Sequence, residues 1–261
     1  MQYADILNLA GLRHDGRKAN ELRELKHNLG VGPYGDGSCY FEQGLNKVLV
    51  VVNGPCEIAR NSQDYVDKGL ITINISNAAF SGIERKVRRQ GGDRRSQEME
   101  GVLKSTLEGV VLLNLYPKSE ISLSVHVFEN DGSIICTIIN ACSMALMDAG
   151  ISMSEMLCSC SIGLIKNRLC IDINNVEQGI GPYLSLAMKA NTEEVVYLQL
   201  ESRLSSELLE DAMENVIKGC RGIKKYIVDA MFSFMNEENI VEDEDNSLTK
   251  MNIDESSGRE S

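Results

Sequence analysis

The sequence predicts an α+β fold in two layers, built as a single folded domain followed by a short tail. Apolar residues alternate with polar ones in several runs of strand length, and they recur at helical spacing in longer runs. Strands and helices come in blocks with no obvious linker between them, which is typical of α+β proteins. At 261 residues the chain is long enough to bury a sizeable core, and its 43% hydrophobic and 25% charged residues are ordinary for a globular protein.

Three strands are predicted in the first half of the chain, after a short N-terminal segment and a Gly-rich turn. Residues 47–55, KVLVVVNGP, indicate a buried strand that ends at its final Gly-Pro pair. Residues 70–80, LITINISNAAF, and residues 121–128, ISLSVHVF, alternate apolar and polar side chains as half-buried strands do. The last of these strands ends at NDGS, residues 130–133, which has the residue types of a turn.

Helices and a hairpin fill the rest of the folded domain. Residues 94–115 show apolar side chains at helical spacing, with Asp93 as the expected N-cap. Residues 134–150 form a second predicted helix that ends at Gly150. The remaining predicted elements are a hairpin over residues 156–174 that turns at Lys166-Asn167, a strand at residues 193–200, and a long amphipathic helix at residues 204–235.

Positive charge is concentrated in one loop, although the whole chain carries a formal net charge of −12. Residues 85–95, here named the basic loop, contain six cationic side chains: Arg85, Lys86, Arg88, Arg89, Arg94 and Arg95. The basic loop leads into the N-terminus of a predicted helix, where free backbone N–H groups and the helix dipole favour anions. It therefore predicts a phosphate-binding surface, but the loop alone is equally compatible with a solvated surface or one that faces a partner protein.

The C-terminal segment is acidic. Residues 236–261 hold nine acidic and two basic side chains, a net charge of −7, so residues 1–235 carry −12 − (−7) = −5. A polar segment without aromatic residues cannot bury enough apolar surface to fold. We expect a folded domain of residues 1–235 and a disordered, solubilising tail of residues 236–261.

The eight cysteines lie singly inside apolar runs, as Cys136, Cys142 and Cys170 do. No pair of C-x-x-C motifs and no histidine cluster accompanies them, so the sequence predicts no metal site. Reduced, buried thiols in an intracellular protein are the expected state. No apolar run approaches the roughly 20 residues that a membrane helix needs, so no membrane association is expected.

Five sequence blocks occur together in the order found in one family. They are GLRHDGR (11–17), EQGLNKVLVVVNGP (42–55), ERKVRRQGGDRRSQEME (84–100), NDGS (130–133) before a helix that ends in MDAG, and CIDINNVEQ (170–178). With these blocks the chain resembles ribonuclease PH-like (RNase PH-like) proteins, and among them the eukaryotic exosome ring subunit that is the counterpart of the catalytic archaeal exosome subunit. The resemblance covers residues 8–235, nearly everything except the acidic tail.

The resemblance implies an RNase PH-type fold, like domain 2 of ribosomal protein S5, and assembly with related RNase PH-like subunits into a hexameric ring. It also implies S1/KH-type cap proteins on the ring, an associated hydrolytic nuclease, and single-stranded RNA threaded through the central pore. The localisation implied is the nucleus, including the nucleolus, and the cytoplasm. In this family the basic loop lines the RNA path, so its six cationic side chains are the predicted RNA contacts.

The same resemblance locates a phosphorolytic site, in which inorganic phosphate attacks the terminal linkage of RNA and releases nucleoside diphosphates. The family's phosphate-binding pattern, Gly-Ser/Thr-Arg, is here Gly132, Ser133 and Ile134, so the guanidinium is absent. The family also has two aspartates six residues apart; Asp172 keeps the first, and Gln178 replaces the second. An amide cannot act as the acid, and it offers no full negative charge to a divalent cation.

These two departures predict a degenerate site with no catalytic residue. Asp172 is a vestigial catalytic candidate, and Gly132 and Ser133 form a vestigial phosphate site. Glu177 could replace the lost aspartate only if its loop shifted. We therefore predict a non-catalytic RNA-binding subunit of the exosome core ring, without a cofactor, that lines the path of RNA during 3′→5′ processing and degradation.

Two other functions stay open. The first is an active phosphate-dependent 3′→5′ exoribonuclease, which would use magnesium and inorganic phosphate. The second is a scaffold whose basic loop binds the acidic surface of another protein.

Overall fold

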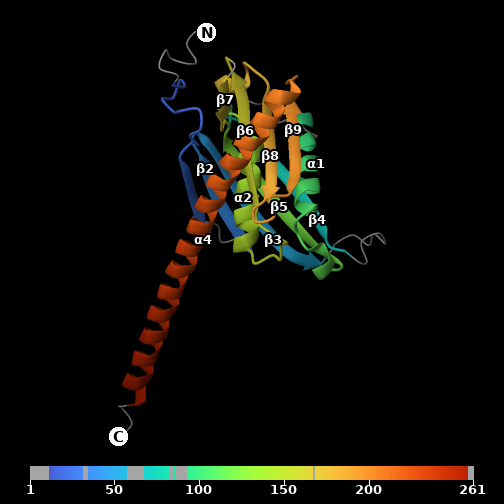
Figure 1. Cartoon of the computed structure of the whole chain (residues 1–261). Coiled ribbons are helices and arrows are strands. Elements are labelled where there is room, and N and C mark those ends of the chain that lie inside the picture. The colour runs from blue at the N-terminus through green and yellow to red at the C-terminus, as the bar shows by residue number, and fades with distance from the viewer. Residues whose placement is uncertain are drawn as a thin grey trace. The chain divides into compact units, whose positions relative to one another are not determined.

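The computed structural model describes residues 12–31, 35–57, 68–82, 85, 93–166 and 168–257, and for residues 237–257 it describes the backbone only. By the contacts between its residues, the chain divides into a compact unit, Met1–Lys224, and a second unit, Lys225–Ser261. Figure 1 shows the order of the elements along the chain. Both sheets and the helix between them belong to the first unit.

The first sheet has five strands in the order β1-β2-β3-β5-β4. Their bounds are β1 Leu25–Leu29, β2 Gly37–Gln43, β3 Asn46–Glu57, β4 Leu70–Asn77 and β5 Ser119–Glu129. Neighbouring strands are antiparallel, except that β4 and β5 run parallel. Alternate residues of β3 and β5 are buried, so one face of this sheet packs against the core, as the alternating sequence predicts.

The second sheet has four antiparallel strands in the order β7-β6-β8-β9. Their bounds are β6 Leu157–Ile165, β7 Arg168–Ile171, β8 Tyr183–Lys189 and β9 Val195–Glu201. The first two strands form the predicted hairpin. β6 and β8 are buried along nearly their whole length, which shows that both faces of the sheet are covered there.

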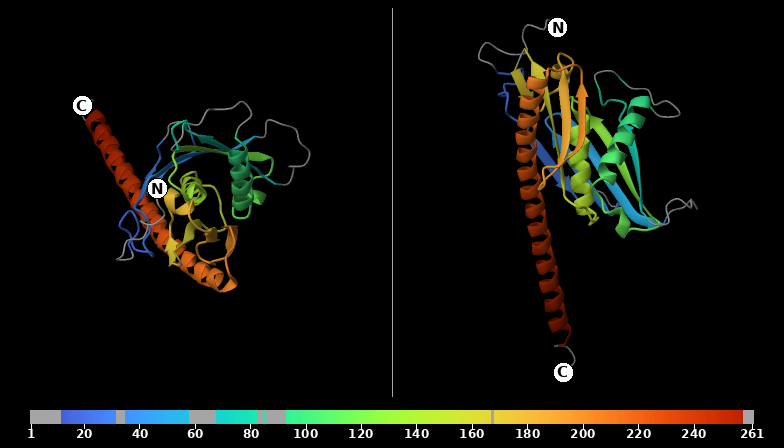
Figure 2. Two further views of the ribbon diagram at one scale, coloured as in Figure 1. Left: turned by 90° about the horizontal axis from the view of Figure 1, so that it is seen from above. Right: turned by 45° about the vertical axis from the view of Figure 1, so that its right-hand side comes forward.

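Helix α2 (Ile134–Asp148) lies between the two sheets, as the view from above in Figure 2 shows. Its Asn140 side chain exchanges two hydrogen bonds with the backbone of Ser159 in β6, at 2.8 and 2.9 Å. Its Asp148 carboxylate accepts a hydrogen bond from the Ser38 amide in β2, at 2.7 Å. Because α2 packs against both sheets, it is buried on nearly every side. Its apolar residues are therefore spread around the helix and are not confined to one stripe along it.

Helix α1 (Arg94–Glu108) packs along β4. The Asn77 side chain of β4 donates to Ser96 Oγ at 2.9 Å, and the Glu100 carboxylate accepts from the Ile75 amide at 2.8 Å. Asp93 occupies the N-cap position, as predicted, although its side chain makes no capping hydrogen bond. The start of α1 is therefore fixed to the end of β4.

Three further helices complete the described chain: the 3-10 helix η2 (Leu113–Leu115), α3 (Asn175–Gln178) and α4 (Ser206–Ser257). Within the first unit, Gly219 of α4 lies against β6. A Cβ atom at Gly219 would come 2.8 Å from Cys160 Sγ, so a larger residue would displace the sheet or the helix. None of the described helices is long and apolar enough to cross a membrane.

The predicted α+β class is confirmed, and the expected packing of a sheet on helices occurs on both sides of α2. Some predicted boundaries are wrong. The helix predicted over residues 94–115 ends at Glu108, and residues 113–115 form a separate 3-10 helix. Strand β3 does not end at Gly54-Pro55 but continues to Glu57, because a register shift between Asn53 and Cys56 accommodates the proline. Strands β1, β2 and β8 and helix α3 have no counterpart among the predicted elements. Seven of the eight cysteines are buried, and Cys56 is exposed.

Residues 236–257 are helical as part of α4, whereas the sequence predicts a disordered tail. The segment contains no glycine or proline, so nothing in its backbone chemistry interrupts a helix. The division into a folded domain of residues 1–235 and an acidic tail stays a prediction.

Candidate functional site

A hollow of about 230 Å³ opens between α1, the β5–α2 turn, α3, β8 and β9. Six of the residues that line it matter for its chemistry: Arg95, Ser133, Ile134, Gln178, Tyr183 and Glu201. The hollow thus brings together one arginine of the basic loop, the vestigial phosphate site and both positions that depart from the family pattern. The sequence placed these residues in three separate blocks, and the fold joins them in one site.

The turn that carries the vestigial phosphate site is rigid. Gly132 has a φ of +84°, and a Cβ atom there would come 2.5 Å from the backbone of both Asn174 and Asn175, so only glycine fits. The Asn46 side chain donates to the Gly132 carbonyl at 2.8 Å and accepts from the Asp131 amide at 2.5 Å. The turn is therefore held against both β3 and the segment before α3.

The two groups of Ser133 that could bind a phosphate already have partners within the chain. Its backbone N–H donates to Gln178 Oε1 at 3.1 Å, and its hydroxyl donates to the Ile173 carbonyl at 3.2 Å. Ile134 follows as the first residue of α2, and its side chain is 8% exposed. At this helix N-terminus, the Gln178 side chain accepts the hydrogen bond of the Ser133 amide. Among the described residues that line the hollow, Arg95 is the cation, and it comes from α1 and not from the position of the family's arginine.

Gln178 is positioned by a capped turn. Asn174 and Glu177 form a reciprocal capping box, in which the Glu177 amide donates to Asn174 Oδ1 and the Asn174 amide donates to Glu177 Oε2, both at 3.0 Å. The buried guanidinium of Arg13 donates to both carboxylate oxygens of Glu177 and to the Ile171 carbonyl, the last at 2.6 Å. Glu177 is thus fully paired and 2% exposed, and it does not substitute for the missing aspartate.

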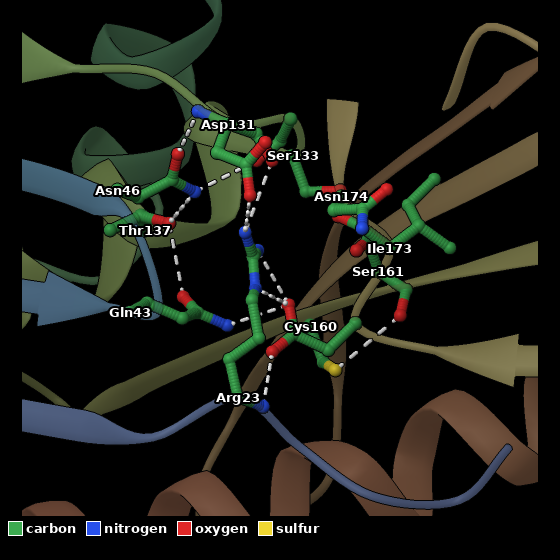
Figure 3. Close-up of polar contacts among 12 residues, drawn as sticks. Arg23, Gln43, Asn46, Asp131, Ser133, Thr137, Cys160, Ser161, Ile173 and Asn174 are labelled. Carbon is green, nitrogen blue, oxygen red and sulfur yellow. Dashed lines mark hydrogen bonds and ion pairs between the residues drawn. The ribbon is translucent and has the colours of Figure 1, made fainter. Parts of the chain in front are cut away.

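Asp172 is fully buried and holds the N-terminal segment to the second sheet. One carboxylate oxygen accepts from Arg23 Nη2 at 2.7 Å, Arg23 Nε at 3.0 Å and Gln43 Nε2 at 2.9 Å, and the other accepts from the Arg23 amide at 2.8 Å. Figure 3 shows the Arg23 side chain between Gln43 and the turn at Asp131.

Asp172 stays ionised. Burial raises the pKa of its carboxyl, but the Arg23 charge and the hydrogen bonds from Arg23 and Gln43 outweigh burial, so the pKa lies below its ordinary value. A carboxylate held in this way is a poor proton donor. The geometry therefore favours a structural role for Asp172, and its assignment as a vestigial catalytic residue stays a prediction.

The arginines of the basic loop are not equivalent. Arg95 lines the hollow. The Arg94 side chain is 91% exposed, and its Nε donates to the Glu98 carboxylate at 3.0 Å. Arg85 is exposed, whereas Lys86, Arg88 and Arg89 lie outside the described residues. Nothing in the sequence distinguishes Arg94 from Arg95.

Acidic and neutral polar groups dominate the far wall of the hollow. Tyr183 is hydrogen-bonded to Glu201 and to Gln178. Burial raises the pKa of Tyr183 to about 12, and its hydrogen bond to Glu201 acts in the same direction. The charged residues of the described lining are the cation Arg95 and the carboxylates Glu98 and Glu201. Within the described ranges, no group of three or more His, Cys, Asp or Glu side chains could hold a metal ion.

Two models of one family match the chain. The 3′ exoribonuclease family, domain 1, matches residues 21–152, and the 3′ exoribonuclease family, domain 2, matches residues 155–219. These matches span well over half of the chain. The protein belongs to the 3′ exoribonuclease family. The predicted resemblance to RNase PH-like proteins is thereby confirmed.

Individual members of the 3′ exoribonuclease family are similar over most of the chain. "Exosome complex component RRP41" of Mus musculus is 39% identical over 221 residues, which are 84% of this chain and 90% of the mouse protein. "Exosome complex component ski6" of Schizosaccharomyces pombe is 36% identical over 223 residues, 85% of this chain and 92% of the yeast protein.

Solved structures show the same fold. Rice Rrp46 superposes with a TM-score of 0.74 at 24% identity, over 82% of this chain and 97% of the rice chain. A chain of the Archaeoglobus fulgidus exosome with RNA bound to the active site superposes with a TM-score of 0.72 at 19% identity, over 83% and 93%. At these identities the likeness extends to the fold alone.

Several residues that build the site of this 3′ exoribonuclease family member were not predicted. Arg13 and Arg23 hold Glu177 and Asp172, yet they lie 164 and 149 residues away in sequence. Arg13 belongs to the GLRHDGR block, whose two arginines and aspartate could have suggested buried ion pairs. Arg23 lies in no such motif. Tyr183 and Glu201 enter the hollow from strands β8 and β9, and only the pairing of those strands brings them together.

Proposed function

We propose that this chain is a non-catalytic RNA-binding subunit of the RNA exosome ring. Its mouse and fission yeast relatives are named as exosome complex components, at 39% and 36% identity over most of the chain. One observation carries the non-catalytic part of the proposal: Gln178 stands in the place of an acid and occupies the Ser133 amide at 3.1 Å. With this arrangement a family member would keep the fold of the site but would lack the acid and the free amide that phosphorolysis needs.

The electrostatics of the hollow support the loss of phosphorolysis. In that reaction a phosphate dianion attacks an RNA phosphodiester, so cations and free amides must hold the two anions together. The charged residues of the described lining are one cation, Arg95, and two carboxylates, Glu98 and Glu201. Loss of one charged contact at such a centre lowers the rate by about 10²-fold or more, and here both the arginine and the acid are replaced.

RNA binding is proposed to rest on the basic loop, Arg85 to Arg95. Arginine suits this task because its planar fork grips phosphate oxygens in pairs. If four arginines (Arg88, Arg89, Arg94 and Arg95) neutralise phosphates, the logarithm of the binding constant falls with the logarithm of salt concentration at a slope of about −3 for single-stranded RNA. Contacts of this kind position RNA without reading its bases, so we expect little sequence preference.

The proposed subunit acts through its assembly. Related RNase PH-like subunits would complete the hexameric ring, S1/KH-type cap proteins would guide RNA into it, and an associated hydrolytic nuclease would degrade the emerging strand. The nucleus, including the nucleolus, and the cytoplasm are the proposed locations. No cofactor is proposed for this function.

The alternative, an active phosphate-dependent exoribonuclease, has one observation in its favour. Arg95 and Ser133 line the same hollow, so part of a phosphate site survives. Asp172 gives this alternative little support, because its carboxylate is buried and bonded to Arg23 and Gln43. Activity would therefore need a residue from a neighbouring subunit.

The test is an assay for nucleoside diphosphates. The reconstituted ring is incubated with an unstructured RNA oligomer, magnesium and inorganic phosphate, and a parallel sample lacks phosphate. We expect RNA to be bound and no diphosphate to be released. Phosphate-dependent diphosphate release that disappears in an Arg95→Ala ring would overturn the non-catalytic proposal and establish the alternative.

A further inference from the structure

Helix α4 continues beyond the two matched family domains. The second family model ends at residue 219, whereas α4 runs on to Ser257 as one helix. The second unit of the chain, Lys225–Ser261, consists of this continuation and the last four residues. The role of this part of α4 therefore has to be inferred from its own residues.

An apolar stripe runs along the first part of this continuation. Ile227 and Ala230 are buried on one side of the helix. The stripe lies on a different side, where Phe232 is 64% exposed and Met235 is 55% exposed. Positions i, i+3, i+4 and i+7 share one side of a helix and are the spacing with which a helix docks on an apolar surface. The side chains at these positions are Val228, Met231, Phe232 and Met235.

Opposite charges precede and follow the apolar stripe. Residues 215–225, here named the basic segment, contain no acidic residue and four cations: Lys218, Arg221, Lys224 and Lys225. Residues 236–245, here named the acidic segment, contain six acidic residues and no cation. The backbone of both segments is helical. Basic, apolar and acidic segments thus follow one another along a single helix.

The cations of the basic segment differ in their partners. Arg221 Nε donates to the Glu193 carboxylate at 2.7 Å, so its charge is offset within the chain. Lys218 and Lys225 are exposed. The Lys218 ammonium donates to a neutral group, Asn215 Oδ1, at 3.3 Å. Positive charge of the basic segment is therefore accessible to an external carboxylate.

The two charged segments lie at matching distances from Phe232. The cations precede Phe232 by 7 to 14 residues, and the acidic residues follow it by 5 to 13. Because a helix rises about 1.5 Å per residue, these positions lie about 10–21 Å before Phe232 and about 8–20 Å after it along the axis. A second α4 that crosses at Phe232 in antiparallel orientation would bring each acidic segment against the other basic segment. A parallel crossing would bring like charges together.

We propose that the apolar stripe of α4 binds a second copy of this chain, with the two α4 helices antiparallel about a two-fold axis at Phe232. Such an interface is self-complementary, because each copy supplies the same stripe and both charged segments. By distance from Phe232, Lys225 of one copy lies opposite Glu238 of the other, and Lys218 lies opposite Asp245. The charges set the orientation, and the stripe supplies the apolar contact.

This inference goes beyond the proposed function, because it concerns contacts between copies of the chain and not contacts with RNA. RNA does not suit this face, since the acidic segment repels phosphates. Another protein in place of the second copy is an outcome of the test.

The first test measures the mass of the purified full chain by sedimentation equilibrium over a range of concentrations. We expect the wild type to change from monomer to dimer as its concentration rises. Phe232→Glu should weaken dimerisation about 100-fold, because each dimer loses two copies of the aromatic contact, and Phe232→Leu should retain it. Phe80→Glu is the matched control: Phe80 is 73% exposed but lies in the first unit, so this variant should dimerise like the wild type. Circular dichroism verifies that each variant stays folded.

The second test exchanges the charges between copies. One variant carries Lys218→Glu with Lys225→Glu, and the other carries Glu238→Lys with Asp245→Lys. Each variant alone should dimerise about tenfold more weakly than the wild type, because like charges then face one another. An equimolar mixture should form mixed dimers more tightly than either variant forms its own, since the exchange restores opposite charges at one end of the helix pair.

Three outcomes would overturn the inference. A wild-type chain that stays monomeric at every concentration shows that the stripe is left for a different protein. Dimerisation that survives Phe232→Glu but is lost in Phe80→Glu shows that another face joins the copies. Charge variants that associate no better in the mixture than alone contradict the antiparallel arrangement. None of these outcomes bears on RNA binding, so the proposed function is tested separately.

Discussion

The arginines of this protein fall into two groups, one buried and paired with carboxylates and one exposed in the basic loop. Arg13 and Arg23 are 3% and 6% exposed, and each donates several hydrogen bonds to a buried carboxylate, Glu177 or Asp172. The basic loop has no such internal partner among its described residues apart from the Glu98 contact of Arg94. The two groups differ in whether the fold supplies a buried carboxylate as a partner. Burial and pairing therefore distinguish an arginine that stabilises the fold from one that stays accessible to an external anion.

The largest expected effect comes from breaking a buried pair. Arg23→Met leaves the Asp172 carboxylate buried without its main partner, and we expect the free energy of unfolding to fall by about 3–5 kcal/mol. Denaturation by urea measures the change. Arg95→Met is the matched control and should leave stability within about 0.5 kcal/mol of wild type. Equal stability of the two variants would contradict the division of the arginines into two groups.

The Asp172 pair also makes stability depend on pH. The pKa of Asp172 is lowered from its ordinary value of 3.8, so its contribution to stability is fully present above that value. The contribution is lost as the pH falls through the lower pKa of the folded state. We therefore expect stability, followed by denaturation from pH 7 downward, to fall more steeply below pH 4 in the wild type than in Asp172→Asn. Parallel curves would show that another carboxylate controls acid unfolding.

A smaller effect distinguishes two neighbours in the basic loop. Arg95 faces the hollow, whereas Arg94 already bonds to Glu98. Arg95→Ala should weaken RNA binding about tenfold and reduce the salt slope by about 0.7, the value for one phosphate contact. Arg94→Ala should do less, because the Glu98 carboxylate already offsets the charge of Arg94 in the wild type. Fluorescence anisotropy at several salt concentrations measures both, and the reverse order would assign the phosphate contact to Arg94.

The smallest effect concerns the stability contribution of that exposed ion pair. Arg94 and Glu98 form an (i, i+4) pair on the surface of α1, with side chains 91% and 64% exposed. Pairs of this kind contribute no more than about 0.5 kcal/mol and are screened by salt. Glu98→Gln should therefore leave the free energy of unfolding almost unchanged, and thermal melting of the variant provides the check. A decrease in the free energy of unfolding as large as that of Arg23→Met would mean that the Arg94–Glu98 pair also stabilises the fold.

The sequence was a good guide where local chemistry decides the outcome. Helix α1 starts after Asp93, α2 ends before Gly150, and the NDGS turn ends β5, because caps, glycine and turn residues act over a few positions. Strands β1 and β2 were missed. Their residues flank a Gly-rich segment, and their strand character depends on pairing with each other and with β3.

The candidate site was predicted in part for the same reason. Ser133, Ile134 and Gln178 could be named from motifs, and the structure brings them together in one hollow. Their contact could not be predicted, because the hydrogen bond from the Ser133 amide to Gln178 joins residues 45 positions apart. The place of Arg23 beside Asp172 was equally hidden, since no short motif records a pairing across 149 residues.

The close approach of Gly132 to Asn174 and Asn175 has a consequence for cooperativity. The family models divide the chain into two matched parts, residues 21–152 and 155–219, and this contact joins one part to the other. The Arg23–Asp172 pair crosses the same division. If either part unfolded alone, it would separate the Arg23–Asp172 ion pair and break the packing of Gly132 against Asn174. We therefore expect the two parts to unfold cooperatively. Calorimetry of this region should show a single transition and not a separate one for each of the two family domains.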